Sequence, residues 1–275
     1  MDPVTSSVER HYGHTGIYES IVDALKEQGM DTTRLQSDDL AMIDEFHVRA
    51  REGTVELAGR HSFKPGTRVL DVGCGIGGSS RFLATKLGCN VTGIDLTHEF
   101  VDTAIRLSEL VGLDGSVKFQ QASALELPFA DNSFDVVWTQ HVQMNIQDKR
   151  RFYSEMARVL VPGGRLVFHD IFQNEDRQPY FPVPWAAEPS ISFLTTPEKA
   201  RSIIESLGLR IIDWEETTAK SLAWMQMMAE KAKAAPKPMP GLQIVMGDQT
   251  KVRLENAMRS LADDRIRVIQ AVAEK

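Results

Sequence analysis

Short apolar runs alternate with helical patterns through the middle of the chain. Strands are predicted at residues 68–72, 90–94, 117–121, 134–139, 165–171 and 210–214. Helices are predicted between them, at residues 77–87, 97–111, 148–160 and 197–207. Alternating strands and helices of these lengths are typical of a parallel sheet covered on both faces. The predicted fold class is therefore α/β, with a doubly wound and mostly parallel sheet.

The first 66 residues show helical patterns and turns without a strand signal. Residues 17–28 repeat apolar positions at helical spacing and stop at Gly29. Residues 37–57 also predict one helix, with Ser37 as the N-cap and two aspartates in its first turn. We therefore expect an N-terminal helical cap over residues 1–66.

Two segments interrupt the alternation. Residues 178–189 contain four prolines and three aromatic residues, and residues 218–262 are helical apart from the run AAPKPMPG. Such insertions usually lie on the ligand side of an α/β sheet. We expect a core over residues 67–215 with a lid at 175–196. Residues 216–275 should complete the same domain with helices and a last strand at 265–272.

Composition narrows the function without identifying it. The chain has 275 residues, 42% of them hydrophobic and 25% charged, as in ordinary globular proteins. The net charge of −7 argues against a nucleic-acid partner. The N-terminus lacks an apolar signal core, and no window approaches the roughly 20 apolar residues that span a bilayer. We expect a cytoplasmic protein with no membrane partner, its two cysteines free and no metal site.

A glycine-rich turn is the main chemical signal. The run VLDVGCGIGG places Gly73 and Gly75 directly after the first strand of the core. Glycines allow a sharp turn and a close ligand approach. The spacing G-x-G-x-G, with Asp71 ahead of it, suits a cationic ligand better than the diphosphate of a dinucleotide. Asp95, at the end of the second strand, is placed to accept both ribose hydroxyls of an adenosine.

Four motifs together carry a family resemblance. VLDVGCGIGGSS, GIDLT, ALELPFADNSFDVVWTQ and RVLVPGGRLVFHDI, in this order, resemble class I S-adenosylmethionine-dependent methyltransferases over roughly residues 66–172. The chain is most similar to small-molecule enzymes of the sarcosine/dimethylglycine N-methyltransferase and natural-product O-methyltransferase types. The resemblance implies a Rossmann-like fold, S-adenosyl-L-methionine as the cofactor and a small-molecule methyl acceptor.

The resemblance also assigns cofactor-binding residues. The residues that match the family motifs are Asp71, Gly73, Cys74, Gly75, Asp95, Leu96, Ser123, Ala124 and Gln140. Many family members carry Asp where this chain has Ser123. Some relatives have a Leu-His pair where this chain has Met144 and Asn145. Ser123 thus lacks the carboxylate that those members offer to adenine, and the catalytic base of those relatives does not transfer directly to this chain.

Three residues are candidates for the chemistry itself. His141 follows the fourth strand, Asp170 ends the fifth strand, and His47 lies on the expected cap helix. Strand ends face the ligand crevice in such folds, and a hydroxyl acceptor usually needs a base. The alternatives are a packed histidine for His47 or His141 and a loop cap for Asp170. Tyr12 and Tyr18 are candidates for lid contacts, with a place in the core as the alternative.

The sequence thus predicts an enzyme that methylates a small-molecule amine or hydroxyl and releases S-adenosylhomocysteine. Two other functions stay open. A non-catalytic protein that binds the cofactor and regulates a partner would carry the same motifs, and a nicotinamide-dependent oxidoreductase would use a similar turn. The sequence does not identify the acceptor, and it leaves a homodimer open.

Overall fold

The computed structural model describes residues 3–12, 15–234 and 241–275. A seven-stranded sheet in the order β3-β2-β1-β4-β5-β7-β6 forms the centre. Six strands point in the same direction, and β7 is antiparallel to its neighbours β5 and β6, so the predicted mostly parallel α/β fold is confirmed. The strands are β1 (Arg68–Val72), β2 (Asn90–Asp95), β3 (Val117–Gln121), β4 (Phe134–Gln140), β5 (Leu160–Gln173), β6 (Arg210–Glu216) and β7 (Ile266–Glu274).

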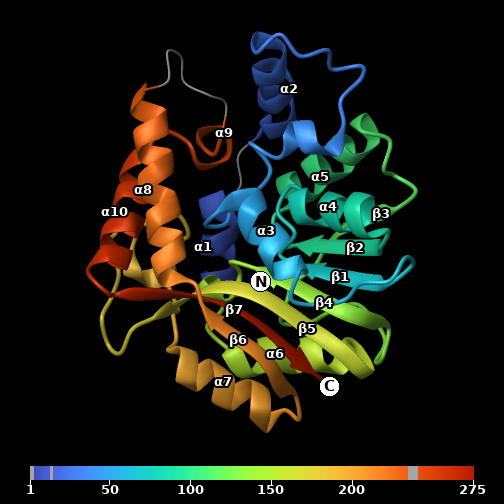
Figure 1. Cartoon of the computed structure of the whole chain (residues 1–275), viewed down its shortest axis with the longest axis vertical. Helices are drawn as coiled ribbons and strands as arrows, with labels where there is room; N and C mark the ends of the chain where they lie inside the picture. The colour runs from blue at the N-terminus through green and yellow to red at the C-terminus, as the bar shows by residue number, and fades with distance from the viewer. Residues whose placement is uncertain (1–2, 13–14, 235–240) are drawn as a thin grey trace.

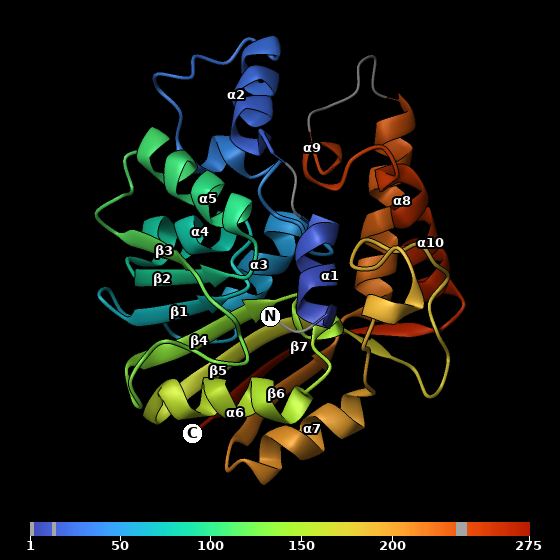
Figure 2. The same cartoon turned by 180° about the vertical axis from the view of Figure 1, so that it is seen from behind.

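Helices cover both faces of this sheet (Figures 1 and 2). On one face lie α3 (Ala50–Ala58), α4 (Gly78–Leu87) and α5 (His98–Leu110), and on the other lie α6 (Lys149–Val159) and α7 (Pro197–Ser206). Alternate strand residues supply the two cores. Val69 and Trp138 pack toward α3 and α4, whereas Leu70 and Val137 pack toward α6. Burial of apolar side chains on both faces explains the continuous apolar runs in the sequence.

The crevice for a ligand is set by the strand order. The strand β1 lies between β2 and β4: the chain continues from β1 to β2 and β3 on one side and returns to β4 on the other, so the strand order reverses at β1. Ligands of open α/β sheets bind outside the carboxyl ends of the strands at such a switch point. The glycine turn follows β1, Asp95 ends β2, and Gln140 ends β4, so all three lie at this edge.

The N-terminal cap differs from the prediction. The helices α1 (Pro3–Tyr12) and α2 (Ile17–Glu27) are present, and α2 matches the predicted helix. The single helix predicted over residues 37–57 is wrong. The structure has a 3-10 turn η1 (Ser37–Leu40), then irregular chain up to α3. Arg49 and Ala50, with φ of 69° and 41°, stand at the break.

Contacts with α4 explain why the helix is interrupted. The Asp44 carboxylate accepts a hydrogen bond from Arg81 at 2.8 Å, and both side chains are fully buried. The carbonyl oxygen of Asp44 lies where a Cβ on Gly78 would come within 2.3 Å. The predicted N-cap is also wrong, because Gln36 rather than Ser37 occupies that position. Tertiary contacts thus override the local helical pattern.

The C-terminal part adds a second layer beside the sheet. The predicted interrupted helical stretch agrees with three helices, α8 (Thr218–Ala234), α9 (Gln243–Met246) and α10 (Thr250–Ala262). Most of the run AAPKPMPG, which is predicted to interrupt the stretch, lies outside the described residues. Figures 1 and 2 both show α1 between α3 and the α8–α10 layer. The predicted lid segment contains a short turn η3 (Pro189–Ile191). Its side chains Val183 and Trp185 are buried in this layer. In the described part of the chain, no helix is long and apolar enough to cross a membrane.

Candidate active site

The glycine turn is held by β2 and by the segment after β4. The N–H groups of Gly73 and Cys74 donate to the carbonyl oxygen of Ile94 at 2.8 and 2.9 Å. Gly73 has a φ of 73°, and a Cβ there would lie 2.2 Å from Val142 Cγ2. The turn therefore requires glycine for its backbone conformation and for the approach of the neighbouring loop. Cys74 is buried in the turn, where burial raises the pKa of its thiol.

Asp95 closes the glycine turn from the end of β2. One carboxylate oxygen accepts the N–H of Gly75 at 2.9 Å, and the other accepts the N–H of Thr97 at 2.9 Å. Burial raises the pKa of Asp95, and these backbone hydrogen bonds oppose the increase. Each oxygen keeps a second lone pair. The carboxylate can therefore hold the turn and still accept ligand hydroxyls.

Asp71 has a different environment from Asp95. Its side chain is buried at the end of β1 and accepts a hydrogen bond from Ser80 Oγ at 2.6 Å. Burial raises the pKa of Asp71 to about 7, while the Ser80 hydrogen bond lowers it. Asp71 thus connects the strand end to the first turn of α4 beneath the glycine turn.

Leu96, predicted as the neighbour of the ribose-binding acid, follows β2, and Ser123 and Ala124, predicted at the adenine-contacting position, follow β3. The carbonyl oxygen of Leu96 accepts a hydrogen bond from Gln121 at 2.8 Å. The hydroxyl of Ser123 accepts the N–H of Leu125 at 3.2 Å, so it stabilises its own turn. Ala124 is half-buried against the core under α6. Leu96, Ser123 and Ala124 line the strand-end edge next to Asp95.

Gln140 has a fixed orientation at the end of β4. Its side-chain oxygen accepts hydrogen bonds from Ser79 Oγ at 2.7 Å and from Trp138 Nε1 at 2.9 Å. Its amide nitrogen is buried and has no partner among the described residues. An unpartnered buried donor is costly unless a ligand or water accepts from it. Gln140 therefore offers N–H groups, rather than an oxygen, to a ligand.

Three histidines meet beside Gln140. The ring of His141 is 4.9 Å from that of His169 and 5.8 Å from that of His47, and the rings of His47 and His169 are 5.7 Å apart. The sequence placed His47 and His141 in the site, and the structure brings both together. Burial lowers the pKa of His141 and of His169 well below the ordinary histidine value, and the charge of His47 adds to both effects.

Glu45 is the main side-chain partner of the His47 imidazole. Its carboxylate contacts His47 Nε2 at 2.7 Å, accepts the Thr54 hydroxyl at 2.6 Å, and pairs with Arg51 at 2.8 Å. Burial raises the pKa of Glu45, but His47, Arg51 and Thr54 together lower it below its ordinary value. Glu45 is therefore an engaged carboxylate rather than a free base.

Asp170 holds the segment that carries His141. Its carboxylate accepts the N–H groups of Val142, Gln143 and Ile171 at 3.1, 3.0 and 2.9 Å. Burial raises the pKa of Asp170 to about 7, while these hydrogen bonds oppose the increase. Among the described residues, the hydrogen-bond partners of this carboxylate are backbone N–H groups and not an imidazole nitrogen. The geometry thus fits a carboxylate that positions the loop after β4.

Tyr12, on α1, contacts residues beside the same strand-end edge. Its hydroxyl donates to Asn145 Oδ1 at 3.0 Å, and its ring contacts Phe100. Burial raises the pKa of Tyr12, and the negative charge of Asp95 raises it further. The structure therefore brings one of the two predicted tyrosines to the site.

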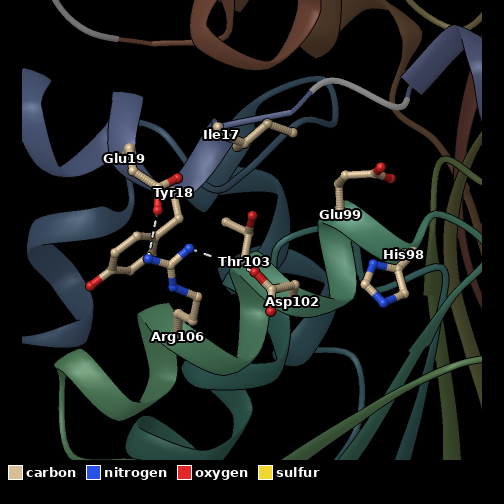
Figure 3. A pocket seen from close by; sticks show the side chains of 9 residues that line it. Ile17, Tyr18, Glu19, His98, Glu99, Asp102, Thr103 and Arg106 are labelled. Atoms are coloured by element: carbon tan, nitrogen blue, oxygen red, sulfur yellow. Dashed lines mark hydrogen bonds and ion pairs between the residues drawn. The ribbon is translucent and has the colours of Figure 1, made fainter.

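Tyr18 lies elsewhere, in a hollow of about 110 Å³ between α2 and α5 (Figure 3). The guanidinium of Arg106 stacks on its ring, 3.7 Å from the centroid, and pairs with Glu19 at 2.6 Å. Figure 3 shows these side chains turned toward one another at the helix surface. None of the residues predicted to bind cofactor or to act in catalysis lines this hollow.

Sequence reasoning missed several residues of the site. Glu45, Thr54 and His169 surround the predicted histidines, and Asn145 joins Tyr12. The sequence shows only that His169 precedes Asp170, whereas its pairing in register with Gln140 across β4 and β5 appears in the folded sheet. The partners of Tyr12 and His47 depend on tertiary packing and had no comparable signal.

Comparisons with known proteins agree with this architecture. Residues 70–168 match the family described as a methyltransferase domain. The 2-methyl-6-phytyl-1,4-hydroquinone methyltransferase of Synechocystis sp. is 46% identical over 136 residues, covering 50% of this chain and 40% of that protein. The sarcosine/dimethylglycine N-methyltransferase of Halorhodospira halochloris is 31% identical over 184 residues, covering 67% of this chain and 65% of that protein. The chain thus matches less than two thirds of these relatives' length.

A solved structure shows the same fold over the whole chain. The geranyl diphosphate C-methyltransferase from Streptomyces coelicolor A3(2) superposes with a TM-score of 0.72 at 18% identity, covering 99% of this chain and 98% of that one. Residues 70–168 therefore form a methyltransferase domain, and the chain has the fold of the class I S-adenosylmethionine-dependent methyltransferases.

Proposed function

We propose that this protein binds S-adenosylmethionine at the carboxyl ends of β1, β2 and β4 and methylates a small-molecule amine or hydroxyl. The observation that carries the proposal is the glycine turn closed by Asp95, because the Gly75 N–H donates to this carboxylate at 2.9 Å. The same carboxylate retains lone pairs for a ribose. The sarcosine/dimethylglycine and hydroquinone methyltransferases that match this chain by sequence support the small-molecule assignment.

The residues of the crevice fit such a cofactor. Gly73 and Gly75 present backbone without side chains, and Asp95 would take the ribose hydroxyls. Leu96, Ser123 and Ala124 would flank the adenine. The unpartnered Nε2 of Gln140 would donate to an acceptor atom of the amino-acid part. When bound, the cofactor would supply an electrophilic methyl group on a sulfonium.

The chain itself would bind, orient and shield. Asp71 holds the first turn of α4, and Asp170 holds the loop that presents His141. Tyr12 and α1 cover the crevice and exclude water, which would otherwise compete with the acceptor. His141 is placed to accept a proton where the acceptor requires it, while His47 stays paired with Glu45.

One experiment separates this function from its alternatives. Calorimetry with S-adenosylmethionine and with NADH tests the cofactor, and a screen of amines, phenols and sugars with radiolabelled S-adenosylmethionine tests transfer. We expect binding of the first cofactor alone and release of S-adenosylhomocysteine with at least one acceptor. Binding without transfer to any acceptor would favour a regulatory protein, and binding of NADH alone would favour an oxidoreductase.

A further inference from the structure

The three histidines carry information about the acceptor. They come from the segment before α3, from the end of β4 and from β5, and their rings lie 4.9 to 5.8 Å apart. His169 is fully buried, and His47 is 8% exposed. Nothing in the sequence motifs requires three imidazoles in one place, so their chemistry needs an explanation.

The three rings differ in their hydrogen bonds. His47 is engaged, because its Nε2 contacts Glu45 at 2.7 Å and its Nδ1 contacts the carbonyl oxygen of Val48 at 3.4 Å. By contrast, Nε2 of His141 and both ring nitrogens of His169 are buried and have no partner among the described residues. Each neutral imidazole offers one N–H donor and one lone pair. The His141–His169 side of the cluster is therefore ready for a ligand that both donates and accepts.

The neighbouring charges favour neutral rings at His141 and His169. Around His141 the structure places His47 ahead of α3 and His169 and Asp170 on β5. Burial lowers the pKa of His141 and of His169, and electrostatic interactions with His47 and Arg49 act in the same direction on His169. Both rings are then uncharged near neutral pH, with a lone pair available.

The carboxylates beside the cluster are already engaged. Glu45 is shared by His47, Thr54 and Arg51, and the Asp170 carboxylate accepts three backbone N–H groups. An ammonium group entering this site would give up its hydration and meet neutral imidazoles instead of a free negative charge. Burial of a cation without such compensation is unfavourable. The cluster thus disfavours a protonated amine.

Building on the proposed function, we infer that the methyl acceptor presents a hydroxyl group to Nε2 of His141, and that His169 is a positioning residue for that imidazole. The hydroxyl oxygen forms the new C–O bond with a lone pair, the C–S bond of the sulfonium breaks, and its electron pair stays on sulfur. The hydroxyl proton moves to His141 Nε2 and from there to solvent.

A weak neutral base is sufficient for a hydroxyl but poorly suited to an ammonium group. A hydroxyl oxygen keeps lone pairs while it is still protonated, so its proton can leave as the C–O bond forms. An ammonium nitrogen has no lone pair until its proton has left. With a pKa of about 10 for an alkyl ammonium group, a histidine of lowered pKa is too weak a base to remove that proton beforehand. The geometry therefore assigns O-methylation.

A single molecule can test the preference for oxygen. Tyramine carries a phenol and an amine on one skeleton, tyrosol carries the phenol with no amine, and phenethylamine carries the amine alone. With radiolabelled S-adenosylmethionine, we expect O-methyl products from tyramine and tyrosol and none from phenethylamine. An N-methyl product from tyramine, or no O-methyl product in protein that binds the cofactor, would overturn the inference.

Variants test the roles of the two histidines. His141→Asn should lower kcat on tyrosol by about a hundredfold or more, as loss of a general base does. Its residual rate should keep rising up to about pH 10, where phenols ionise unaided. His169→Asn should lower kcat about tenfold while KM for the cofactor stays constant. His169→Phe, which keeps a ring but has no nitrogen, should lower kcat further. His61→Asn, whose ring contacts Phe63 away from the site, is the matched control.

Two further measurements keep the outcomes distinct. Calorimetry with S-adenosylmethionine is done on the wild type and on each variant. A wild type that does not bind S-adenosylmethionine would contradict the proposed function rather than this inference. Thermal unfolding identifies variants that fail to fold. If His169→Asn fails to fold, His169→Gln takes its place. Equal kcat in wild type and His141→Asn, or a pH profile unchanged by that substitution, would remove His141 as the base.

Discussion

Asp95 shows how one side chain both shapes the site and contacts the proposed ligand. Its two oxygens accept the N–H groups of Gly75 and Thr97, which fixes the glycine turn relative to α5. The same oxygens are proposed to accept ribose hydroxyls. Its loss would therefore affect the ligand more than the core, because the β2 strand is held by its own ladder on both sides.

We predict that Asp95→Asn lowers the affinity for S-adenosylmethionine by about tenfold to a hundredfold. A hydrogen bond to a charged group contributes roughly 1.5–3 kcal/mol, and the amide can replace only part of it. Calorimetry measures the affinity, and thermal unfolding checks the fold. Asp114→Asn, at an exposed loop position, is the control. Equal affinities for the two variants would remove Asp95 from the cofactor site.

Lys149 is a buried cation that holds the loop after β4. Its Nζ donates to the carbonyl oxygens of Gln143, Ile146 and Phe193. We predict that Lys149→Met lowers the free energy of unfolding by about 1–3 kcal/mol, because three carbonyl groups lose their donor. Urea unfolding at neutral pH measures the change. The exposed Lys231→Met should stay within about 0.5 kcal/mol of the wild type.

The pH dependence of that difference has a definite sign. Burial lowers the pKa of Lys149 to about 7 in the folded protein, and the charge of Asp170 partly opposes the decrease. The unfolded chain has a lysine pKa of about 10.4, so it binds more protons between these values and stability rises with pH. The gap in unfolding free energy between wild type and Lys149→Met should widen from about pH 7 to about pH 10. A constant or narrowing gap contradicts this assignment.

At the scale of elements, the sequence predicted the repeating part of the fold and missed what tertiary contacts decide. All strands of the sheet and the helices between them follow from apolar periodicity and from glycine and proline at their ends. The helix expected over residues 37–57 failed because buried Asp44 pairs with Arg81 of α4. Periodicity reports which face of an element is apolar, whereas it contains no information on a partner distant in sequence.

The site divides in the same way. The glycine turn, Asp95 and His141 could be placed from motifs because each follows directly from a strand end. His169 stayed hidden because its importance comes from the 4.9 Å approach of another ring, which only the folded sheet creates. Motifs therefore identified residues of the proposed cofactor side better than those of the proposed acceptor side.

Three elements meet at one side chain above the crevice. Asn145, in the 3-10 turn η2 (Gln143–Asn145), accepts the Tyr12 hydroxyl from α1. Its amide nitrogen donates to the carbonyl oxygens of Trp185 and Ile191 at 2.8 and 2.9 Å. This arrangement ties α1 and the predicted lid segment to the loop after β4, so α1 is positioned to close over a bound ligand.

We predict that Tyr12→Phe lowers turnover about tenfold while the affinity for S-adenosylmethionine changes by about threefold or less. The variant loses one neutral hydrogen bond, worth about 1 kcal/mol, and the cover over the reacting groups loosens. Single-turnover assays and calorimetry separate the two effects. Tyr18→Phe, which leaves the ring under Arg106, should behave as the wild type. Parallel losses in both variants would show a general effect of the cap.

At the scale of the whole molecule, the segment after α3 is joined to the last two strands of the sheet. Arg60, just after α3, donates to Gln270 of β7 at 3.0 Å and to Asp213 of β6 at 2.7 Å. It also contacts Glu215 of β6 and Glu56 of α3. Its side chain is only 12% exposed, so the cap and the last strands share one partly buried cation.

We predict that Arg60→Met lowers the free energy of unfolding by about 1–3 kcal/mol. The buried side chain of Gln270 loses its hydrogen-bond donor. The carboxylates of Asp213 and Glu215 are left close together without a cation, and their partial exposure lets solvent screen the resulting repulsion. Arg210→Met is the matched control, since Arg210 is 68% exposed and pairs with Glu274 at the rim of the sheet. That variant should lose at most about 0.5 kcal/mol.

The same comparison tests whether cap and sheet unfold together. Because Arg60 joins segments far apart in sequence, its loss should lower the midpoint of one cooperative transition by about 2–4 °C per kcal/mol, in both near- and far-ultraviolet signals. Differential scanning calorimetry of wild type, Arg60→Met and Arg210→Met measures this directly. Two separate transitions in the wild type would show that the cap folds independently. Equal losses in the two variants would show that the buried position of Arg60 contributes nothing special.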